Sequence, residues 1–308
     1  MPSIREMRLR IRSIKNLAQV TRALETVSAS KVRRAVQANE QTYPYAKKAW
    51  QVLVHLASQP GRNSLHPLLM DREHAKKDLV LLITSDRGLT GAYNVNIVRH
   101  VLLTMRDNDL PIVYVTVGRK GRDMLLRRRK TVIAEFSGIP ATPTFTSCAP
   151  IGSLIVDEYL HGNVDEVFIA YTEFHTMLYQ QPVIRKILPL KPESEDLTDP
   201  LLSGLEKKNS PRVFSYEPGA EELLNEILPR FTALQIYQAL LSAQASEHAA
   251  RMVAMRNATE SAKELIGVLQ LEYNKARQAG ITNDMLDISG GAEALAQAMA
   301  GKKARTNN

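Results

Sequence analysis

The last third of the chain carries a long, uninterrupted heptad pattern. Apolar or small residues recur in alternating steps of four and three: Leu241, Ala245, His248, Met252, Met255, Thr259, Ala262, Ile266, Leu269, Tyr273, Ala276 and Gly280. Such a seam is typical of helices packed side by side in a coiled coil, and it extends over about 60 Å at 1.5 Å per residue. Small residues replace many of the usual leucines, so the seam buries less apolar area. We expect a helix that needs a partner or a sheath.

The first 57 residues predict a second long helix, because no glycine precedes Gly61. An apolar seam steps by three or four residues, with one irregular step near Leu17 that indicates a stammer; it comprises Ile4, Met7, Ile11, Ile14, Leu17, Val20, Leu24 and Val27. We expect Pro44 to kink or end this first helix. Pro229 is expected to mark a kink between a short leading helix and the carboxy-terminal rod.

Between these arms, short β-branched runs alternate with amphipathic helical stretches. The runs are 78–84, 111–117, 131–137 and 165–174, and the helical stretches are 94–107, 121–129 and 149–162. This alternation predicts a mainly parallel sheet with right-handed crossovers. Residues 178–190 are a candidate added strand, and the polar segment 191–211 is expected to be mobile.

The predicted fold class is α/β with a long α-helical coiled coil. Two arms that join one side of a central mainly parallel α/β domain must run antiparallel, and each has an apolar stripe to cover. We therefore expect an antiparallel two-helix rod, with the longer last arm projecting beyond it. The expected domains are the helix 1–60, the α/β domain 76–217 and the helix and tail 218–308.

Positive charge is concentrated at the amino terminus. Residues 1–57 carry eleven Lys or Arg against three acids, a surplus of eight that equals the net charge of the whole chain. This surplus indicates either a solvated helix face or an acidic partner such as nucleic acid, anionic lipid or a protein loop. The amino terminus has no apolar signal core and no apolar run is long enough to span a bilayer, so we expect a cytosolic or membrane-peripheral protein.

The sequence has few motifs that are associated with catalysis or ligand binding. The segment SDRGLTGAYN (85–94) lies where a strand turns into a helix, the usual place for a phosphate cradle. It has only half of a nucleotide-binding motif, so the favoured reading is a tight turn anchored by Asp86 and Arg87. The single cysteine, Cys148, is expected to be a small buried residue, and His248 a structural histidine. No catalytic residue, cofactor or metal is expected.

Three segments resemble the gamma subunit of rotary (F-type) ATP synthases. They are IRSIKNLAQVTRALETVSASKVRRA (11–35), the SDRGLTGAYN turn, and SEHAARMVAMRNATESAKELI with LQLEYNKARQAGIT (246–266 and 269–282). The resemblance implies a non-catalytic central-stalk rotor that couples ion-driven rotation to ATP synthesis or hydrolysis. Its paired helices would be a shaft inside three alpha and three beta subunits, and its α/β domain a foot beside the epsilon subunit on the c ring. It would be peripheral, on the cytoplasmic face of the plasma membrane.

The resemblance also implies partner-binding residues. Arg277, Gln278 and Thr282 match positions that hydrogen-bond a loop of a catalytic subunit. In the family, another surface meets an acidic loop of the beta subunits, and it is matched here by the basic residues Arg8, Arg12, Lys15 and Arg22. Leu24 corresponds to a position close to that same loop. Glu217, in FSYEPG (214–219), corresponds to a contact with the c ring.

Two departures from the family pattern matter. A single cysteine excludes the redox switch of chloroplast members, and the extra tail 296–308 is expected to fray. Two alternatives of other classes remain open. One is a basic coiled-coil protein that binds nucleic acid, although the chain lacks a nucleic-acid recognition motif. The other is an α/β nucleotide enzyme with helical arms.

Overall fold

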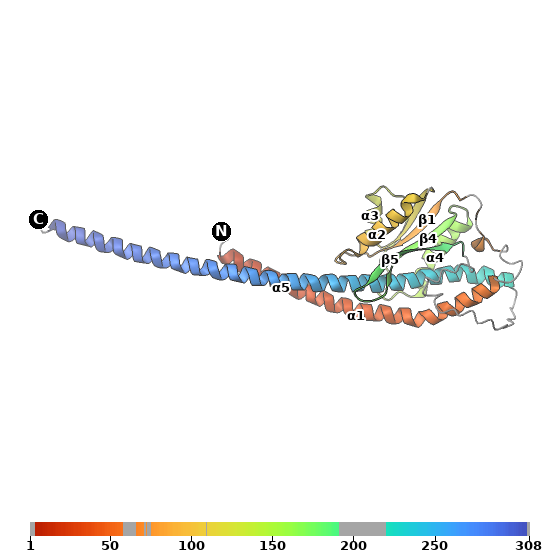
Figure 1. Ribbon diagram of the computed structural model, residues 1–308, viewed down its shortest axis with the longest axis horizontal. Helices are drawn as coiled ribbons and strands as arrows, with labels where there is room; N and C mark the ends of the chain where they lie inside the picture. Colours follow the sequence, from red (N-terminus) through yellow and green to blue (C-terminus); the bar gives the residue numbers. More distant parts are fainter. Residues whose placement is uncertain are drawn as a thin grey trace. The chain divides into compact units, whose positions relative to one another are not determined.

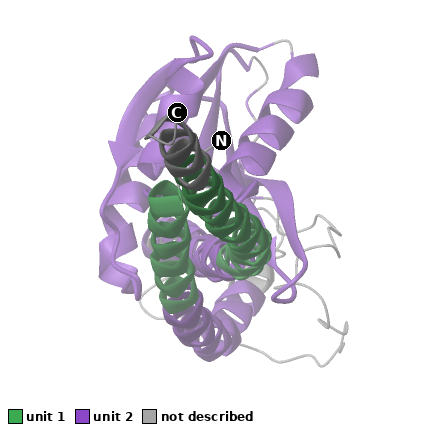
Figure 2. Cartoon of the chain, turned by 90° about the vertical axis from the view of Figure 1, so that its left-hand side faces the viewer, with its two compact units in different colours: residues 1–24, 255–308 green, residues 25–254 purple. Residues whose placement is uncertain are grey.

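The structure, a computed structural model, describes residues 4–57, 66–70, 72, 75–108, 110–190 and 220–306. The chain divides into two compact units (Figure 2). Unit 1 contains residues 1–24 and 255–308, and unit 2 contains residues 25–254. Two long helices, α1 (Ile4–Ala57) and α5 (Ala220–Thr306), each contribute one segment to both units.

Unit 2 is built on a five-stranded sheet. Its strands are β1 (Asp78–Ile83), β2 (Ile112–Val117), β3 (Val132–Phe136), β4 (Glu166–Phe174) and β5 (Gln180–Leu188), in the spatial order β3-β2-β1-β4-β5. The first four are parallel, and β5 pairs antiparallel with β4. The predictions of a mainly parallel sheet and of an added strand at 178–190 are both confirmed.

Helices cover both faces of the sheet. On one face, Val80 and Leu82 of β1 pack in a cluster with α2 (Tyr93–Thr104) and α3 (Arg119–Leu126). On the other, the alternating residues of β1 join a larger cluster with α4 (Phe145–Leu160) and the unit 2 segments of α1 and α5 (Figure 1). Strands buried on both faces read as continuous apolar runs. Two short 3₁₀ helices, η1 (Pro67–Leu69) and η2 (Met105–Asp107), complete the unit.

Neither proline ends its helix. Helix α1 continues through Pro44 to Ala57, and α5 is one continuous helix through Pro229. The possible end at Pro44 is therefore wrong, while the kinks expected at the two prolines stay predictions. A proline inside a helix costs about 3 kcal/mol, and packing close to both prolines offsets this. Trp50 and Phe231 are buried in the larger cluster with their ring centroids 5.2 Å apart.

The predicted fraying of 296–308 is also wrong over most of that range, since α5 extends to Thr306. The segment 191–211, which was expected to be mobile, lies outside the described residues. Glu217 and the FSYEPG motif lie outside them too.

In unit 1 the two ends of the chain pair. The buried hydroxyls of Thr21 and Thr259 are 2.7 Å apart, and Arg8 Nη2 donates to the Tyr273 hydroxyl at 2.9 Å. Partner numbers on α5 fall as those on α1 rise, so the two helices run antiparallel within this unit. Their seam on α5 is the predicted one, with Met255, Thr259 and Ala262 buried.

The seam on α1 differs from the prediction. Its buried and half-buried positions alternate in steps of four and three without a stammer: Met7, Ile11, Ile14, Ala18, Thr21, Glu25, Ser28, Val32 and Ala35. Leu17, Val20 and Val27 are instead 56%, 56% and 52% exposed. The stammer prediction followed the large apolar residues, whereas the small residues at Ala18, Thr21 and Ser28 allow a close approach.

Candidate partner-binding surfaces

The first predicted basic group lies on α1 in unit 1. Arg8, Arg12 and Lys15 are all exposed. Arg8 differs from the others because its guanidinium lies 5.8 Å from the centroid of the Tyr273 ring and donates a hydrogen bond to the Tyr273 hydroxyl. This hydrogen bond raises the pKa of Arg8 and lowers the pKa of Tyr273. Arg8 therefore makes a contact between the two chain ends, which the sequence did not indicate.

The predicted group on α5 lies beside Arg8. Arg277, Gln278 and Thr282 are exposed, and Thr282 Oγ1 donates to the Gln278 carbonyl oxygen at 3.0 Å. The positive charge of Arg277 also lowers the pKa of Tyr273, so Arg8 and Arg277 both act on one phenol. The structure thus brings together predicted residues that lie at opposite ends of the sequence.

Arg22 and Leu24 belong to a different part of unit 1. They follow Thr21, which pairs with Thr259, about 20 Å from Arg8 at 1.5 Å per helical residue. Leu24 is half-buried and Arg22 is exposed. The described site residues are therefore distributed along the helix pair and do not form one cluster.

The 85–94 turn in unit 2 is anchored by Asp86. Its carboxylate accepts hydrogen bonds from the backbone N–H groups of Arg119 at 3.1 Å and Gly138 at 2.8 Å. Arg87 contributes its backbone carbonyl, which accepts from Ser85 Oγ at 2.7 Å. The tight-turn interpretation is confirmed for Asp86, while the side chain of Arg87 is exposed.

This turn holds helix α5. Tyr93 Oη donates to the Ala243 carbonyl at 3.1 Å, and Arg251 Nη2 reaches the Gly88 carbonyl at 3.5 Å. A Cβ on Gly91, whose φ is +56°, would lie 3.7 Å from Ala254 Cβ. Parallel α/β sheets bind ligands at the carboxyl ends of strands where the strand order reverses. Here α5 lies against the carboxyl end of β4, where Ser246 Oγ donates to the Thr172 carbonyl at 3.0 Å and the Phe174 N–H donates to Ser242 Oγ at 2.9 Å.

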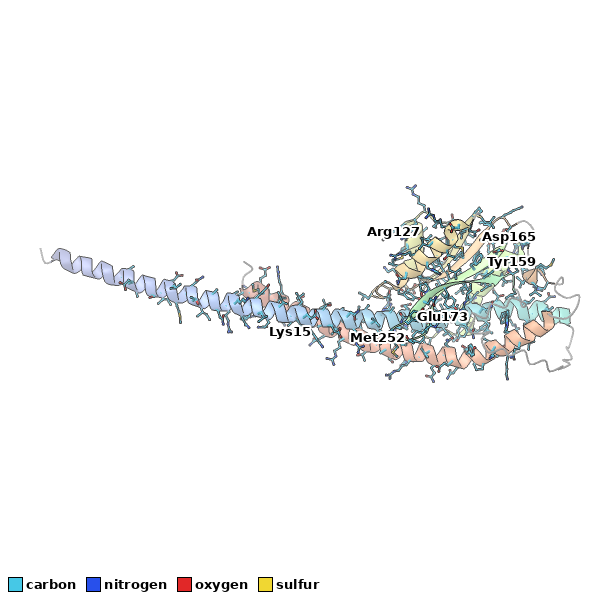
Figure 3. The ribbon with its side chains drawn as sticks, in the orientation of Figure 1. Lys15, Arg127, Tyr159, Asp165, Glu173 and Met252 are labelled. Atoms are coloured by element: carbon cyan, nitrogen blue, oxygen red, sulfur yellow. The ribbon has the colours of Figure 1, made fainter. Side chains whose placement is uncertain are left out.

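A half-buried ionic cluster lies on this stretch of α5, which Met252 marks in Figure 3. Arg251 pairs with Glu247 at 2.7 Å, and its guanidinium also lies 3.2 Å from His248 Nδ1. Burial raises the pKa of Glu247. Burial and the charge of Arg251 lower the pKa of His248 to about 4. The i,i+4 spacing of Glu247 and Arg251 is the signal by which the sequence could have indicated this pair.

His248 is a buried structural residue, as predicted. Cys148 is also buried, and burial raises the pKa of its thiol to about 11. Within the described residues, no three His, Cys, Asp or Glu side chains gather as metal ligands would. None of the helices in those same ranges has the length and apolarity needed to cross a membrane.

Comparisons with known proteins cover almost the whole chain. A family model described as ATP synthase matches residues 3–295. The ATP synthase gamma chain of Dehalococcoides mccartyi is 44% identical over 297 residues, covering 96% of this chain and 100% of the relative. The gamma chain of Roseiflexus castenholzii is 41% identical over 303 residues, with the same coverage.

The chain belongs to the ATP synthase gamma-chain family. Among solved structures, the central stalk and c ring of the Tetrahymena thermophila mitochondrial ATP synthase contains a chain with a TM-score of 0.59 and 26% identity, covering 78% of this chain and 99% of that one. A chain of the Euglena gracilis mitochondrial assembly of OSCP, F1 and c ring has a TM-score of 0.64, 21% identity and coverage of 95% and 94%. The second likeness shows the fold alone.

Proposed function

We propose that this chain is the central-stalk rotor subunit of an ATP synthase. It couples ion-driven rotation of the c ring to the conformational cycle of a head of three alpha and three beta subunits, with epsilon as a further partner. The observation that carries the proposal is the antiparallel pairing of the two chain ends in unit 1. The family membership supplies the assembly in which such a pair acts as a shaft.

The physical basis of coupling is asymmetry. A single rod inside a socket of near-threefold symmetry presents a different face to each catalytic subunit. Contacts that differ in free energy between conformational states shift each subunit towards a different state. Rotation of the rod then moves each subunit through the states in turn. The chain itself is non-catalytic in this proposal.

The rod is an antiparallel coiled coil formed by the arms 1–60 and 218–308, with the domain 76–217 as the foot. Its seam is lean, because Thr21, Thr259 and Ala262 bury little apolar area. A sheath of alpha and beta subunits supplies the missing burial. Exposed apolar residues on both arms, including Val20 and Leu271, are 56% and 65% exposed and are available for this sheath.

The exposed residues provide the specific contacts. Arg277, Gln278 and Thr282 engage acceptors on a catalytic-subunit loop, and their several donors can bind and release. Arg12, Lys15 and Arg22 face an acidic beta-subunit loop near Leu24, with Arg8 contributing its charge while it bonds Tyr273. Glu217 contacts the c ring. The assembly lies on the cytoplasmic face of the plasma membrane.

Co-expression with alpha and beta subunits tests the proposal. We expect a complex that holds one copy of this chain per head, measured by native mass spectrometry, and no ATPase activity from the chain alone. Two or more copies per head would contradict the shaft model. Nothing in the comparisons supports the nucleic-acid alternative.

A further inference from the structure

A cavity of about 480 Å³ opens on unit 2 away from the surfaces described above. It lies between the end of α2 with η2, the start of β2, and the turn that follows α3. Leu102, Met105 and Ile112 are among its apolar lining residues, together with the buried Tyr114. Three cationic side chains also line it: Arg106, Arg128 and Lys130. The cavity thus combines an apolar interior with positive charge.

The three cations lack carboxylate partners among the described residues. Arg128 Nη1 donates to the Met124 carbonyl at 3.2 Å, and neither Arg106 nor Lys130 takes part in an ion pair within that part of the chain. The neighbouring carboxylates of Asp78 and Asp107 do not line the cavity. Three like charges around one opening repel each other, and a bound anion relieves that repulsion.

The cavity is separate from the α5 contacts of unit 2. It lies at the amino ends of the strands, since Ile112 begins β2 and is level with Asp78 of β1. The 85–94 turn that holds α5 lies at the carboxyl ends. The apolar residues inside the cavity also belong to the cluster with α2 and α3. That cluster lies on the opposite face of the sheet from α1 and α5. The helical arms therefore leave this opening uncovered within unit 2.

We propose that this cavity docks an acidic segment of a protein partner that inserts an apolar side chain. The inference rests on the proposed function, which places this domain among other protein subunits. Charge complementarity argues for the acidic segment, because arginine guanidinium groups match the geometry of carboxylates. Exposed ion pairs contribute little affinity, so the apolar interior supplies binding while the cations select the partner. The volume lies within the range of about 300–1,000 Å³ that is usual for ligand sites.

Site-specific crosslinking in the assembled complex tests this proposal. Leu110→Cys places a thiol in the cavity lining, and Leu126→Cys places one on the exposed end of α3, outside the lining. The native Cys148 is buried and does not compete for a thiol-reactive photo-crosslinker. We expect mass spectrometry to identify, from the Leu110 site only, a peptide of another protein that combines Asp or Glu with a large apolar residue. A lipid adduct, or labelling no greater than from Leu126, would overturn the proposal.

A matched pair of double variants tests the role of charge. Arg128→Gln with Lys130→Gln removes two cations that line the cavity, while Arg127→Gln with Arg129→Gln removes two from the same turn that do not (Figure 3 labels Arg127). We expect the crosslink yield to fall about tenfold in the first variant and less than about twofold in the second. Equal losses would mean that only net charge matters and would overturn the cavity as a specific site.

Assembly with alpha and beta subunits is measured on the same variants. A complete assembly that includes epsilon and the c ring but gives no crosslink would refute this docking site while leaving the rotor proposal intact. Failure of wild-type assembly would instead refute the rotor proposal.

Discussion

At the scale of single residues, small polar side chains control how the chain ends meet. Thr21 and Thr259 are 7% and 5% exposed, and one hydrogen bond of 2.7 Å joins their hydroxyls. Thr259 Oγ1 also donates to the Met255 carbonyl at 2.8 Å. A buried hydroxyl without a partner costs about 1–3 kcal/mol, so this pair both permits close approach and penalises other registers.

We predict that Thr21→Leu destabilises the chain by about 1–3 kcal/mol, because a larger side chain overpacks the seam opposite Thr259. Chemical denaturation measures this change. The matched control is Val20→Ala, one residue away and 56% exposed, which should change stability by less than about 0.5 kcal/mol. Equal effects at both positions would contradict this prediction and would indicate that the large apolar residues form the seam.

A second residue-scale prediction concerns His248, whose pKa is lowered from 6.5 to about 4 in the folded chain. Between these values the unfolded chain binds the proton and the folded chain does not, so stability falls as pH falls from 6.5 to about 4. The loss is about 3 kcal/mol at most. Arg251 and Lys31 both oppose protonation of this ring.

His248→Gln should remove that part of the pH dependence, measured as the difference in unfolding free energy from wild type across pH 4–7. The neighbouring Glu247 has a raised pKa and contributes with the opposite sign, because its protonated form is favoured in the folded chain. Comparing the two proteins cancels this contribution if it is unchanged. Parallel stability curves for both proteins would show that His248 does not titrate in the way proposed.

At the scale of elements, the glycine-containing turn between β1 and α2 is a support for α5. Gly91 has a φ of +56° and lies against Ala254, while a Cβ on Gly88 would meet nothing within 4 Å. The two glycines of one motif therefore have different roles. The positive φ requires glycine only at Gly91, which is also the glycine that faces α5.

We predict that Gly91→Ala destabilises unit 2 by about 1–2 kcal/mol, because an L side chain is strained at this φ. Amide hydrogen exchange should also increase in α5 near Ala254. Gly88→Ala is the control and should leave exchange there unchanged. If the two variants behave alike, the turn does not support the helix through Gly91.

At the scale of the whole molecule, the exposed residues on α1 and α5 concern the assembled motor. We predict that Arg277→Ala or Gln278→Leu lowers ATP turnover of the complex about tenfold by removing hydrogen bonds that form and break during rotation. Assembly should be largely intact, as judged by gel filtration. Wild-type turnover in both variants would exclude these residues from the coupling mechanism.

Leu24→Lys should slow turnover of the complex, because an added ammonium group forms an unwanted ion pair with an acidic loop. The defect should ease as ionic strength rises from about 0.05 M to about 0.5 M, since salt screens exposed charges. Leu24→Gln is the control, because it is polar but uncharged. A defect that is independent of salt would refute the electrostatic explanation.

Much of this fold was predictable from local pattern. The heptads of α5 reflect burial of one helix face, and the continuous apolar runs of the strands reflect burial of both sheet faces. The candidate site was less predictable. Motif resemblance indicated Arg277 and Arg8, but only packing showed that Arg8 bonds Tyr273 and that Arg277 acts on the same phenol.

The sequence by itself therefore determined the α/β sheet, the helical arms and the seam of α5, because these depend on the periodicity of buried apolar residues. Tertiary structure alone decided the true seam of α1, the continuity of the helices through Pro44 and Pro229, and the use of the 85–94 turn to hold α5. Each of these depends on contacts between segments far apart in the chain. There, the space available to a side chain and the hydrogen bonds it finds outweigh its local propensity.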